Sequence, residues 1–98
     1  MSVQAEVRDN PAQNRYETTV DGVLAIAEYR RDGDALVFTH TLVPEAIGGR
    51  GVGTALIRGA LDDARTKNLK VVPRCSFVVD FMRRHTDYRD LLAEDARL

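Results

Sequence analysis

A glycine-rich segment at positions 48–53 constrains this chain more than any other stretch, because four of its six residues are glycine. An apolar, β-rich segment, 35–43, precedes it, and a segment with helical periodicity, 52–67, follows it. A glycine turn between a strand and a helix exposes several backbone N–H groups at the positive end of the helix dipole. The sequence therefore predicts a strand–turn–helix unit whose turn can hold a phosphate or another anion.

The segment after the glycines, 54–67, has the pattern of an amphipathic helix of about four turns. Leu56, Ala60 and Ala64 form one apolar stripe, and charged side chains occupy the other side. A short segment with two adjacent valines, 69–74, then predicts a strand. Strand, turn, helix and strand in this order predict a β-α-β unit with a right-handed parallel crossover.

The first half of the chain has the pattern of an antiparallel meander of about four strands. The predicted strands are 3–8, 15–20, 23–31 and 35–43. Residues 9–11 are expected to break the first strand, and 12–14 to form a loop. Asp21-Gly22 separates two of the runs, and this dipeptide favours a two-residue hairpin turn that requires positive φ.

The last part of the chain predicts a helix over 77–85, with Ser76 as its N-cap. The segment 87–92 is expected to pack through Tyr88, Leu91 and Leu92. The fold class that follows is mixed α+β. An antiparallel meander of about four strands is followed by a β-α-β unit and a C-terminal helix, in one domain spanning 1–98.

Composition excludes several classes of protein. The chain has 98 residues, a net charge of −1, 44% hydrophobic residues and 30% charged residues, which is ordinary for a globular domain. A charge near zero predicts neither nucleic acid nor a membrane surface as a partner. The single cysteine, Cys75, excludes an intramolecular disulfide and a multi-cysteine metal site, and no metal is expected. Without a signal-like or long apolar segment, a cytoplasmic location is expected.

Two familiar phosphate loops do not fit the glycine segment. A Walker A loop requires lysine after its last glycine, and Thr54 stands there instead. A dinucleotide-binding Gly-x-Gly-x-x-Gly loop requires a third glycine, and Thr54 also occupies that position. From the residues alone, a mobile glycine loop without a ligand remains the alternative.

The segment Arg50-Gly51-Val52-Gly53-Thr54-Ala55 resembles the Arg/Gln-x-x-Gly-x-Gly/Ala signature of the GCN5-related N-acetyltransferase superfamily. The predicted order of elements is also similar to that superfamily. The chain further resembles a subfamily of very small members through His40-Thr41-Leu42-Val43-Pro44, Val72-Pro73-Arg74-Cys75 and a closing His85-Thr86-Asp87-Tyr88. That subfamily often has Pro-Glu where this chain has Thr86-Asp87, which weakens any role for the tail.

The resemblance implies acetyl-coenzyme A as co-substrate and an N-acetyltransferase reaction on an amine. It assigns the cradle of the coenzyme's diphosphate to Arg50, Gly51, Val52, Gly53 and Thr54. It places Leu42 and Val43 along the pantetheine arm, with a backbone N–H near them polarising the thioester carbonyl. Arg83 or Arg84 near the cofactor is an additional hypothesis, with a solvated face as the alternative.

Two side chains are candidate catalytic residues. Strand alternation is expected to place His40 on the same face as Phe38 and Leu42, close to the thioester, where it would act as general base for the amine. The alternative is a buried histidine bonded to backbone. Cys75, between a strand end and a helix start, is a candidate for protonating the leaving thiolate or for carrying the acetyl group itself. The alternative is a small apolar core residue. Tyr88 is expected either to shape a pocket or to pack.

The acceptor side is expected to be open. Larger superfamily members insert helices between their first two strands, and here only residues 9–14 lie between them. An open site suits a small amine, a peptide or a protein, and the residues do not identify which. The main hypothesis is a small acetyl-coenzyme A-dependent N-acetyltransferase. The alternatives are a coenzyme A-binding or acetyl-carrying module that acts through Cys75, and an interaction domain that binds no nucleotide.

Overall fold

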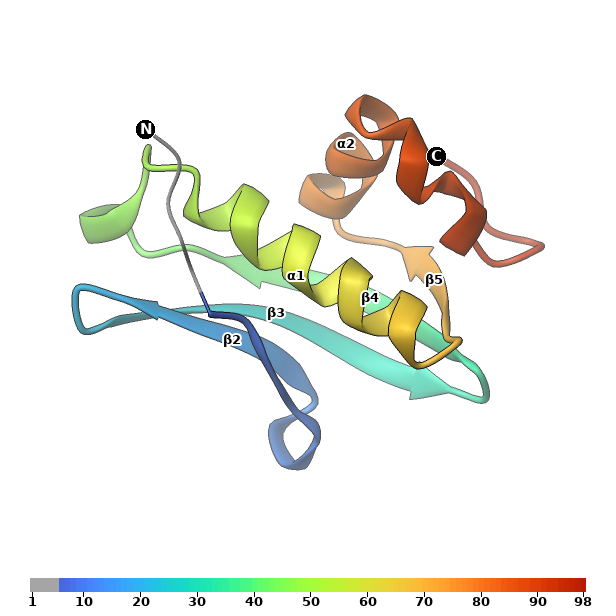
Figure 1. The fold of residues 1–98 in the computed structure, drawn as a ribbon, viewed down its shortest axis with the longest axis horizontal. Helices are drawn as coiled ribbons and strands as arrows, with labels where there is room; N and C mark the ends of the chain where they lie inside the picture. The colour runs from blue at the N-terminus through green and yellow to red at the C-terminus, as the bar shows by residue number, and fades with distance from the viewer. Residues whose placement is uncertain (1–5) are drawn as a thin grey trace.

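The computed structural model describes residues 6–98, which form one five-stranded sheet with helices packed on it (Figure 1). The strands lie in sequence order: β1 (Arg8–Asn10), β2 (Arg15–Val20), β3 (Val23–Asp32), β4 (Ala35–Leu42) and β5 (Lys70–Pro73). The helices are η1 (Pro11–Gln13), η2 (Glu45–Ile47), α1 (Val52–Thr66), α2 (Ser76–Arg84) and η3 (Thr86–Leu91). All neighbouring strands pair antiparallel except β4 and β5, which are parallel. This arrangement confirms the predicted α+β class, with its meander, β-α-β unit and C-terminal helix.

The hairpin turns follow the sequence signals. Asp21 and Gly22 have φ of 50° and 76°, so the β2–β3 connection is the predicted two-residue turn. Gly33, at φ 58°, lies in the turn from β3 to β4. Asn68, at φ 57°, takes the left-handed conformation after α1. These positions end the strands and the helix, and so fix the lengths of the elements around the site.

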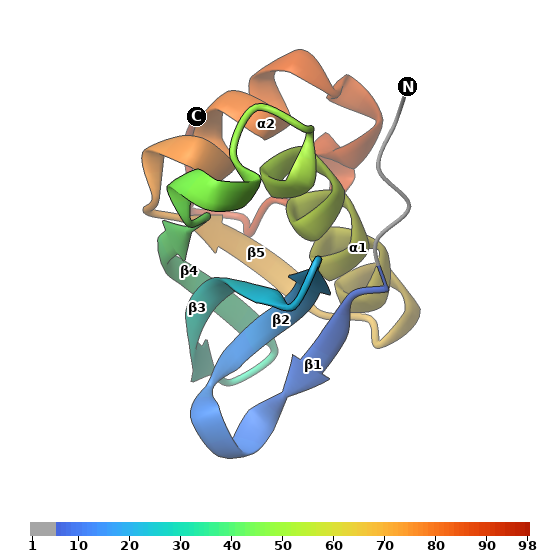
Figure 2. The ribbon, with the colours of Figure 1, turned by 90° about the vertical axis from the view of Figure 1, so that its left-hand side faces the viewer.

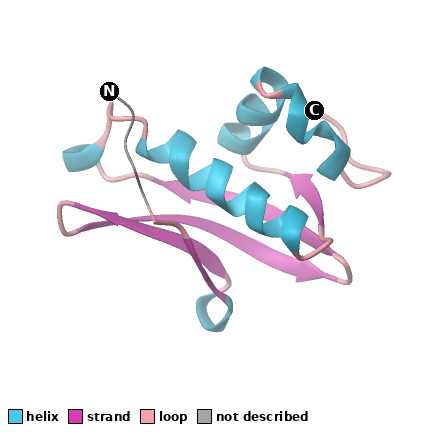
Figure 3. Ribbon diagram, viewed as in Figure 1, coloured by secondary structure: helices cyan, strands magenta, loops and turns pink. Residues whose placement is uncertain are grey.

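Both long helices pack on the same face of the sheet (Figures 2 and 3). The predicted stripe of α1 is fully buried, with Leu56, Ala60 and Ala64 at 0% exposure. It packs against the aromatic cluster of Tyr16, Tyr29 and Phe38 from the sheet. Burial of this apolar surface holds the helix across the strands, at about 25 cal/mol for each Å² removed from water.

A polar network at the C-terminal half of α1 also ties this helix to the sheet. The Tyr16 hydroxyl donates to Asp63 at 2.7 Å, and the Tyr29 hydroxyl donates to Asp9 at 2.6 Å. Lys67 Nζ bridges the two carboxylates at 2.7 Å to Asp63 and 3.0 Å to Asp9. Asp63 of α1, the C-cap residue Lys67 and three sheet residues are therefore joined at the end of α1 opposite to the glycine loop.

Two predictions about element ends are wrong. Of the predicted first strand, 3–8, residues 3–5 lie outside the described residues and residues 6 and 7 are not in a strand. Instead β1 covers Arg8–Asn10, so residues 9 and 10 do not break it. The break comes later because the Asn10 side chain accepts from the Gln13 N–H and caps η1. In addition, Cys75 rather than Ser76 is the N-cap residue of α2, and its side chain makes no capping hydrogen bond.

None of the helices within residues 6–98 combines the length and the apolar character that crossing a membrane would require.

Candidate active site

The glycine loop presents a row of unpaired backbone donors. The N–H groups of residues 49–54 donate to no acceptor among residues 6–98, and the first helical bond of α1 is Ala55 N–H to the Gly51 carbonyl. Gly49 and Gly51 have φ of 75° and 77°, a backbone region that favours glycine. Successive amides that turn inward at a helix N-terminus form an anion-binding concavity. The loop is therefore a candidate anion-binding site.

A hollow of about 250 Å³ lies beside these amides. Its wall is formed by the loop, by Val43 at the end of β4 and by the ring of Phe77 from α2. Phe77 is 39% exposed, which is unusual for a phenylalanine in a small domain. Thr54 and Phe77 also line a second hollow of about 140 Å³, together with His85, Arg84 and other residues of α2. Two adjacent hollows therefore lie at the N-terminus of α1.

The Arg50 side chain does not line this hollow. Its guanidinium pairs with the carboxylate of Asp21 in the β2–β3 turn. The two side chains are 45% and 67% exposed, and exposed ion pairs of this kind contribute little stability. The backbone N–H of Arg50 is one of the unpaired amides, whereas its guanidinium pairs with Asp21 of the neighbouring turn.

The strands β4 and β5 separate immediately after Phe38 and Pro73, the last pair in their register. The N–H groups of Arg74 and Cys75 both donate to the Phe38 carbonyl at 3.0 Å, which turns the chain away into α2. Beyond this point the two strands are unpaired, and we call the place where they separate the strand opening. Thr41 and Cys75 lie on either side of it, and their Oγ1 and Sγ atoms are in contact at 3.3 Å.

A β-bulge at Thr39 changes which side chains face this opening. Tyr29 pairs with Phe38 but Glu28 pairs with His40, so Thr39 is an extra residue in β4. Residues directly opposite in an antiparallel pair share a face. The prediction that His40 shares a face with Phe38 is therefore wrong.

The bulge instead places Thr41, opposite the buried Ala27, on the helix-covered face. His40, opposite Glu28, lies on the other face of the sheet. His40 is exposed, and its side chain has no hydrogen bond to the backbone of residues 6–98, unlike the buried histidine that was the alternative. The two predicted catalytic residues thus approach the opening from opposite faces of the sheet.

The two residues predicted to lie along the pantetheine arm, Leu42 and Val43, are also on different sides of the sheet. Val43 lines the hollow beside the glycine loop, whereas Leu42 pairs with Ile26 on the opposite face and is 51% exposed. Cys75 is half-buried and packs at the edge of the core. Glu28, Thr41 and Phe77 were missed by sequence reasoning. The positions of Glu28 and Thr41 could have been predicted only from a strand pattern that already included the bulge at Thr39.

Tyr88 packs rather than lining a pocket. Its ring lies 5.4 Å from that of Phe81, and the Arg65 guanidinium lies over it at 5.2 Å. Its hydroxyl donates to Asp62 at 2.6 Å. Burial, and then this hydrogen bond, raise the pKa of Tyr88 above its ordinary value. The residue therefore holds η3 against α1.

Comparison with known proteins agrees with the fold. A family model described as GCN5-related N-acetyltransferase matches residues 15–91. The NMR solution structure of a GCN5-like candidate N-acetyltransferase from Staphylococcus aureus is similar, with 30% sequence identity and a TM-score of 0.69. That match covers 90% of this chain and 87% of the other. The chain belongs to the GCN5-related N-acetyltransferase family.

Proposed function

We propose that this protein is an acetyl-coenzyme A-dependent N-acetyltransferase. The observation that carries the proposal is the row of unpaired amides at residues 49–54, which opens beside the separated ends of β4 and β5. The amides of Arg50, Gly51, Val52, Gly53 and Thr54 hold the diphosphate, and Val43 contacts the pantetheine arm. The exposed Leu42 lies on the other face, so only its backbone is offered for that contact.

When bound, acetyl-coenzyme A supplies the thioester whose acetyl group the acceptor nitrogen takes. The acceptor arrives as an ammonium and loses two protons. A ring nitrogen of His40 takes the first proton and passes it to solvent. The N–C bond then forms as the C–S bond breaks, and Sγ of Cys75 gives a proton to the leaving sulfur. The second proton from the nitrogen replaces the one that Cys75 gave.

The division of residues between the faces supports this scheme. Cys75 and Thr41 lie on the side of the glycine loop, where a leaving thiol would be. His40 lies on the opposite side, with the carboxylate-bearing Glu28 directly across the strand pair. An acceptor that enters from that side reaches His40 before it reaches the thioester. The base and the acid are then separated by the reacting atoms.

Thermal shift tests cofactor binding independently of catalysis. A ligand that binds only the folded state stabilises it by about 2.7 kcal/mol at 100 times its Kd. Acetyl-coenzyme A is expected to raise the melting temperature, and coenzyme A release with a panel of amines is expected to show transfer. The absence of a shift at millimolar cofactor would reject the proposal and leave an interaction domain.

A second function, an acetyl-carrying protein, is favoured by the contact between Cys75 and Thr41. A hydroxyl 3.3 Å from Sγ can donate a hydrogen bond to the thiolate, and so stabilise the nucleophile once its proton has passed to solvent. In this case, intact-mass measurement after incubation with acetyl-coenzyme A would show an acetyl adduct on Cys75 that persists when amines are added. Rapid loss of the adduct to amines would instead indicate a two-step transferase.

A further inference from the structure

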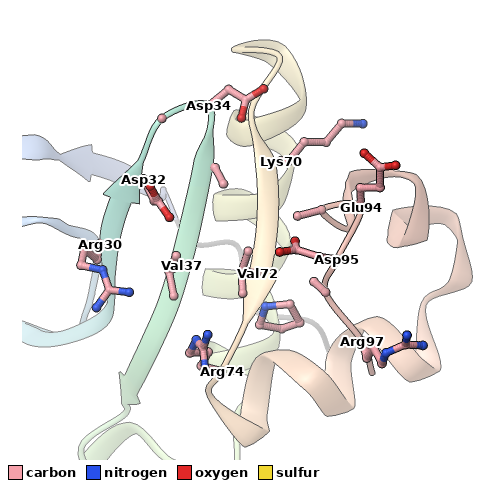
Figure 4. Close-up of a pocket in the computed structure, with 15 residues that line it drawn as sticks. Arg30, Asp32, Asp34, Val37, Lys70, Val72, Arg74, Glu94, Asp95 and Arg97 are labelled. Carbon is pink, nitrogen blue, oxygen red and sulfur yellow. The ribbon is translucent and has the colours of Figure 1, made fainter.

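A large groove lies on the face of the sheet that α1 and α2 do not cover (Figure 4). Its volume is about 840 Å³. Its floor is formed by Val37 of β4 and Val72 of β5, which are partners in the parallel register. One wall comes from β3, and the other from the C-terminal segment 93–97. That segment is held against β5 by the hydrogen bond from the Ala93 N–H to the Val71 carbonyl, at 2.9 Å.

Two arginines occupy one end of this groove. Arg30 lies opposite Val37 in the β3–β4 register, and Arg74 follows β5. Figure 4 shows their guanidinium groups at the same end, on either side of β4. Neither arginine forms an ion pair or a side-chain hydrogen bond with any residue in 6–98. Two unpaired, fork-shaped donors over an apolar floor favour a carboxylate ligand.

The acidic side chains of the groove lie toward the other end. Asp34 and Glu94 are farthest from the arginines, and Asp32 and Asp95 lie between (Figure 4). None of these carboxylates pairs with Arg30 or Arg74 in the described chain. Lys70 and Arg97 also line the groove, and Figure 4 shows Lys70 at the end of Asp34 and Glu94, so charges of both signs lie along it and the unpaired arginines Arg30 and Arg74 lie together at one end. A carboxylate matches the planar, bidentate donor geometry of an arginine guanidinium.

The end of the groove with Arg30 and Arg74 is also the end nearest the strand opening, because Pro73 and Arg74 line the groove and the β4–β5 pairing ends at Pro73. Arg74 precedes Cys75, and its N–H donates to the Phe38 carbonyl where the strands separate. His40 lies on the groove's face of the sheet, because it pairs with Glu28 two residues before Arg30. A molecule in the groove can therefore present an amine to the opening while its remaining groups contact Arg30 and Arg74.

We infer that this groove is the acceptor site. It selects acceptor molecules in which a carboxylate lies near the amine that reacts. The inference rests on the proposed function and narrows its substrate class to amino acids or peptides. In a free amino acid the carboxylate is that of the molecule itself. In a peptide it comes from an acidic side chain beside the amine. Both sources offer the same chemistry to the two arginines.

Pairs of acceptors that differ only in carboxylate against carboxamide test the inference. Lysine and lysinamide represent the free amino acid. The tripeptide amides glycyl-aspartyl-alanine and glycyl-asparaginyl-alanine represent the peptide. In at least one pair, kcat/KM is expected to be tenfold or more higher for the carboxylate, and that pair identifies the source. Lysinamide has the more readily deprotonated α-amine, so intrinsic reactivity works against the expected preference. Equal values in both pairs would overturn the inference.

Substitutions test whether the arginines produce the preference. Arg30→Gln and Arg74→Gln are expected to reduce it to about twofold, and Arg30→Glu to reverse it. Arg31→Gln is the matched control, because Arg31 is the next residue of β3, pairs with Leu36, and bonds only to the Gly33 carbonyl. This variant should keep the full preference. A preference that persists in both glutamine variants would contradict the assignment.

Binding without catalysis separates this inference from the proposed function. N-acetylglycine and N-acetylglycinamide mimic the two products, and an NMR titration of the protein can follow the amide signals of Val37, Val72 and Arg74. Shifts with N-acetylglycine alone, lost in Arg30→Gln, would support the groove even if no amine were acetylated. Equal responses to both compounds would overturn the groove assignment even if acetyl transfer were demonstrated.

Discussion

The ring of Phe77 lies where a side chain on Gly53 would have to be. A β-carbon built on Gly53 would be 2.6 Å from Cζ of that ring, well inside contact distance. The glycine at this position is therefore explained by packing between α1 and α2, and not only by the approach of a phosphate. Gly51 differs, because a β-carbon there meets no atom within 4 Å, and its constraint is the positive φ of 77°.

Gly53→Val is expected to abolish the thermal shift caused by acetyl-coenzyme A. The valine must displace Phe77, and its methyl groups then occupy the space beside the loop amides. Because the ring is 39% exposed and can turn toward solvent, the free energy of unfolding should fall by only about 1–2 kcal/mol. The double variant Gly53→Val, Phe77→Ala should recover stability without recovering binding. A full cofactor shift in Gly53→Val would show that the loop is not the cradle.

Cys75→Ala is expected to lower kcat by about a hundredfold, the size of a typical general-acid contribution. Thr41→Val should lower kcat several-fold, because it leaves Sγ without the hydroxyl 3.3 Å away while keeping the side-chain volume. Single-turnover kinetics separates chemistry from product release. Ser76→Ala is the matched control, since Ser76 is the next residue in the chain and is exposed. Full turnover by Cys75→Ala would reduce this residue to a packing role.

His40→Gln is expected to lower kcat/KM by a hundredfold or more while leaving acetyl-coenzyme A affinity unchanged. The histidine lies on the face opposite to the glycine loop, so its loss removes the base without altering the cofactor hollow. Because His40 is exposed, added imidazole should reach the vacated position and restore part of the rate. Glu28→Gln should give a smaller loss, and failure of imidazole to restore any rate would argue against His40 as the base.

Much of this architecture was predictable from local sequence signals. The glycine loop, the Asp21-Gly22 hairpin and the apolar stripe of α1 each depend on residues close together in the chain. The turns require positive φ, which glycine favours, and the helix requires apolar residues at helical spacing. Both requirements can be recognised from the residue types alone. The order of elements follows from these signals.

The details of the site depend on pairings that no local signal encodes. The bulge at Thr39 is set by how β4 pairs with β3, and the residue itself is an ordinary strand residue. That single extra residue moved His40 and Leu42 to the face opposite to the one expected. The pairing of Arg50 with Asp21 joins residues 29 positions apart, and the side-chain type did not indicate it.

The tyrosine network predicts a loss of stability at alkaline pH. Burial, and then the hydrogen bond to Asp63, raise the pKa of Tyr16 well above its ordinary value of 10.0, and burial with the bond to Asp9 raises that of Tyr29. In the unfolded chain both hydroxyls ionise near pH 10, so stability is complete below that pH and falls above it. Above pH 10, each tyrosine lowers the free energy of unfolding by about 1.4 kcal/mol per pH unit.

Tyr16→Phe should therefore lower the free energy of unfolding by about 1–2 kcal/mol at pH 7, because the hydrogen bond to Asp63 is lost. Above pH 10, the free energy of unfolding should fall less steeply, because only Tyr29 then contributes to the slope. Urea unfolding between pH 7 and pH 11.5 measures both effects. An unchanged alkaline slope in Tyr16→Phe would show that the Tyr16 hydroxyl ionises as readily in the folded chain as in the unfolded one.

Gly59→Ala should destabilise the protein although alanine normally stabilises a helix interior by about 1 kcal/mol relative to glycine. Gly59 lies within α1, and a β-carbon there would be 2.6 Å from Cβ of Val7, an atom fixed to the main chain that cannot turn away. The segment before β1 must then lift from the helix. We expect a lower melting temperature and faster amide exchange at residues 6–8. The double variant Gly59→Ala, Val7→Gly removes the collision and should recover most of the loss. A Gly59→Ala variant more stable than the parent would show that residue 7 does not pack on the helix in solution.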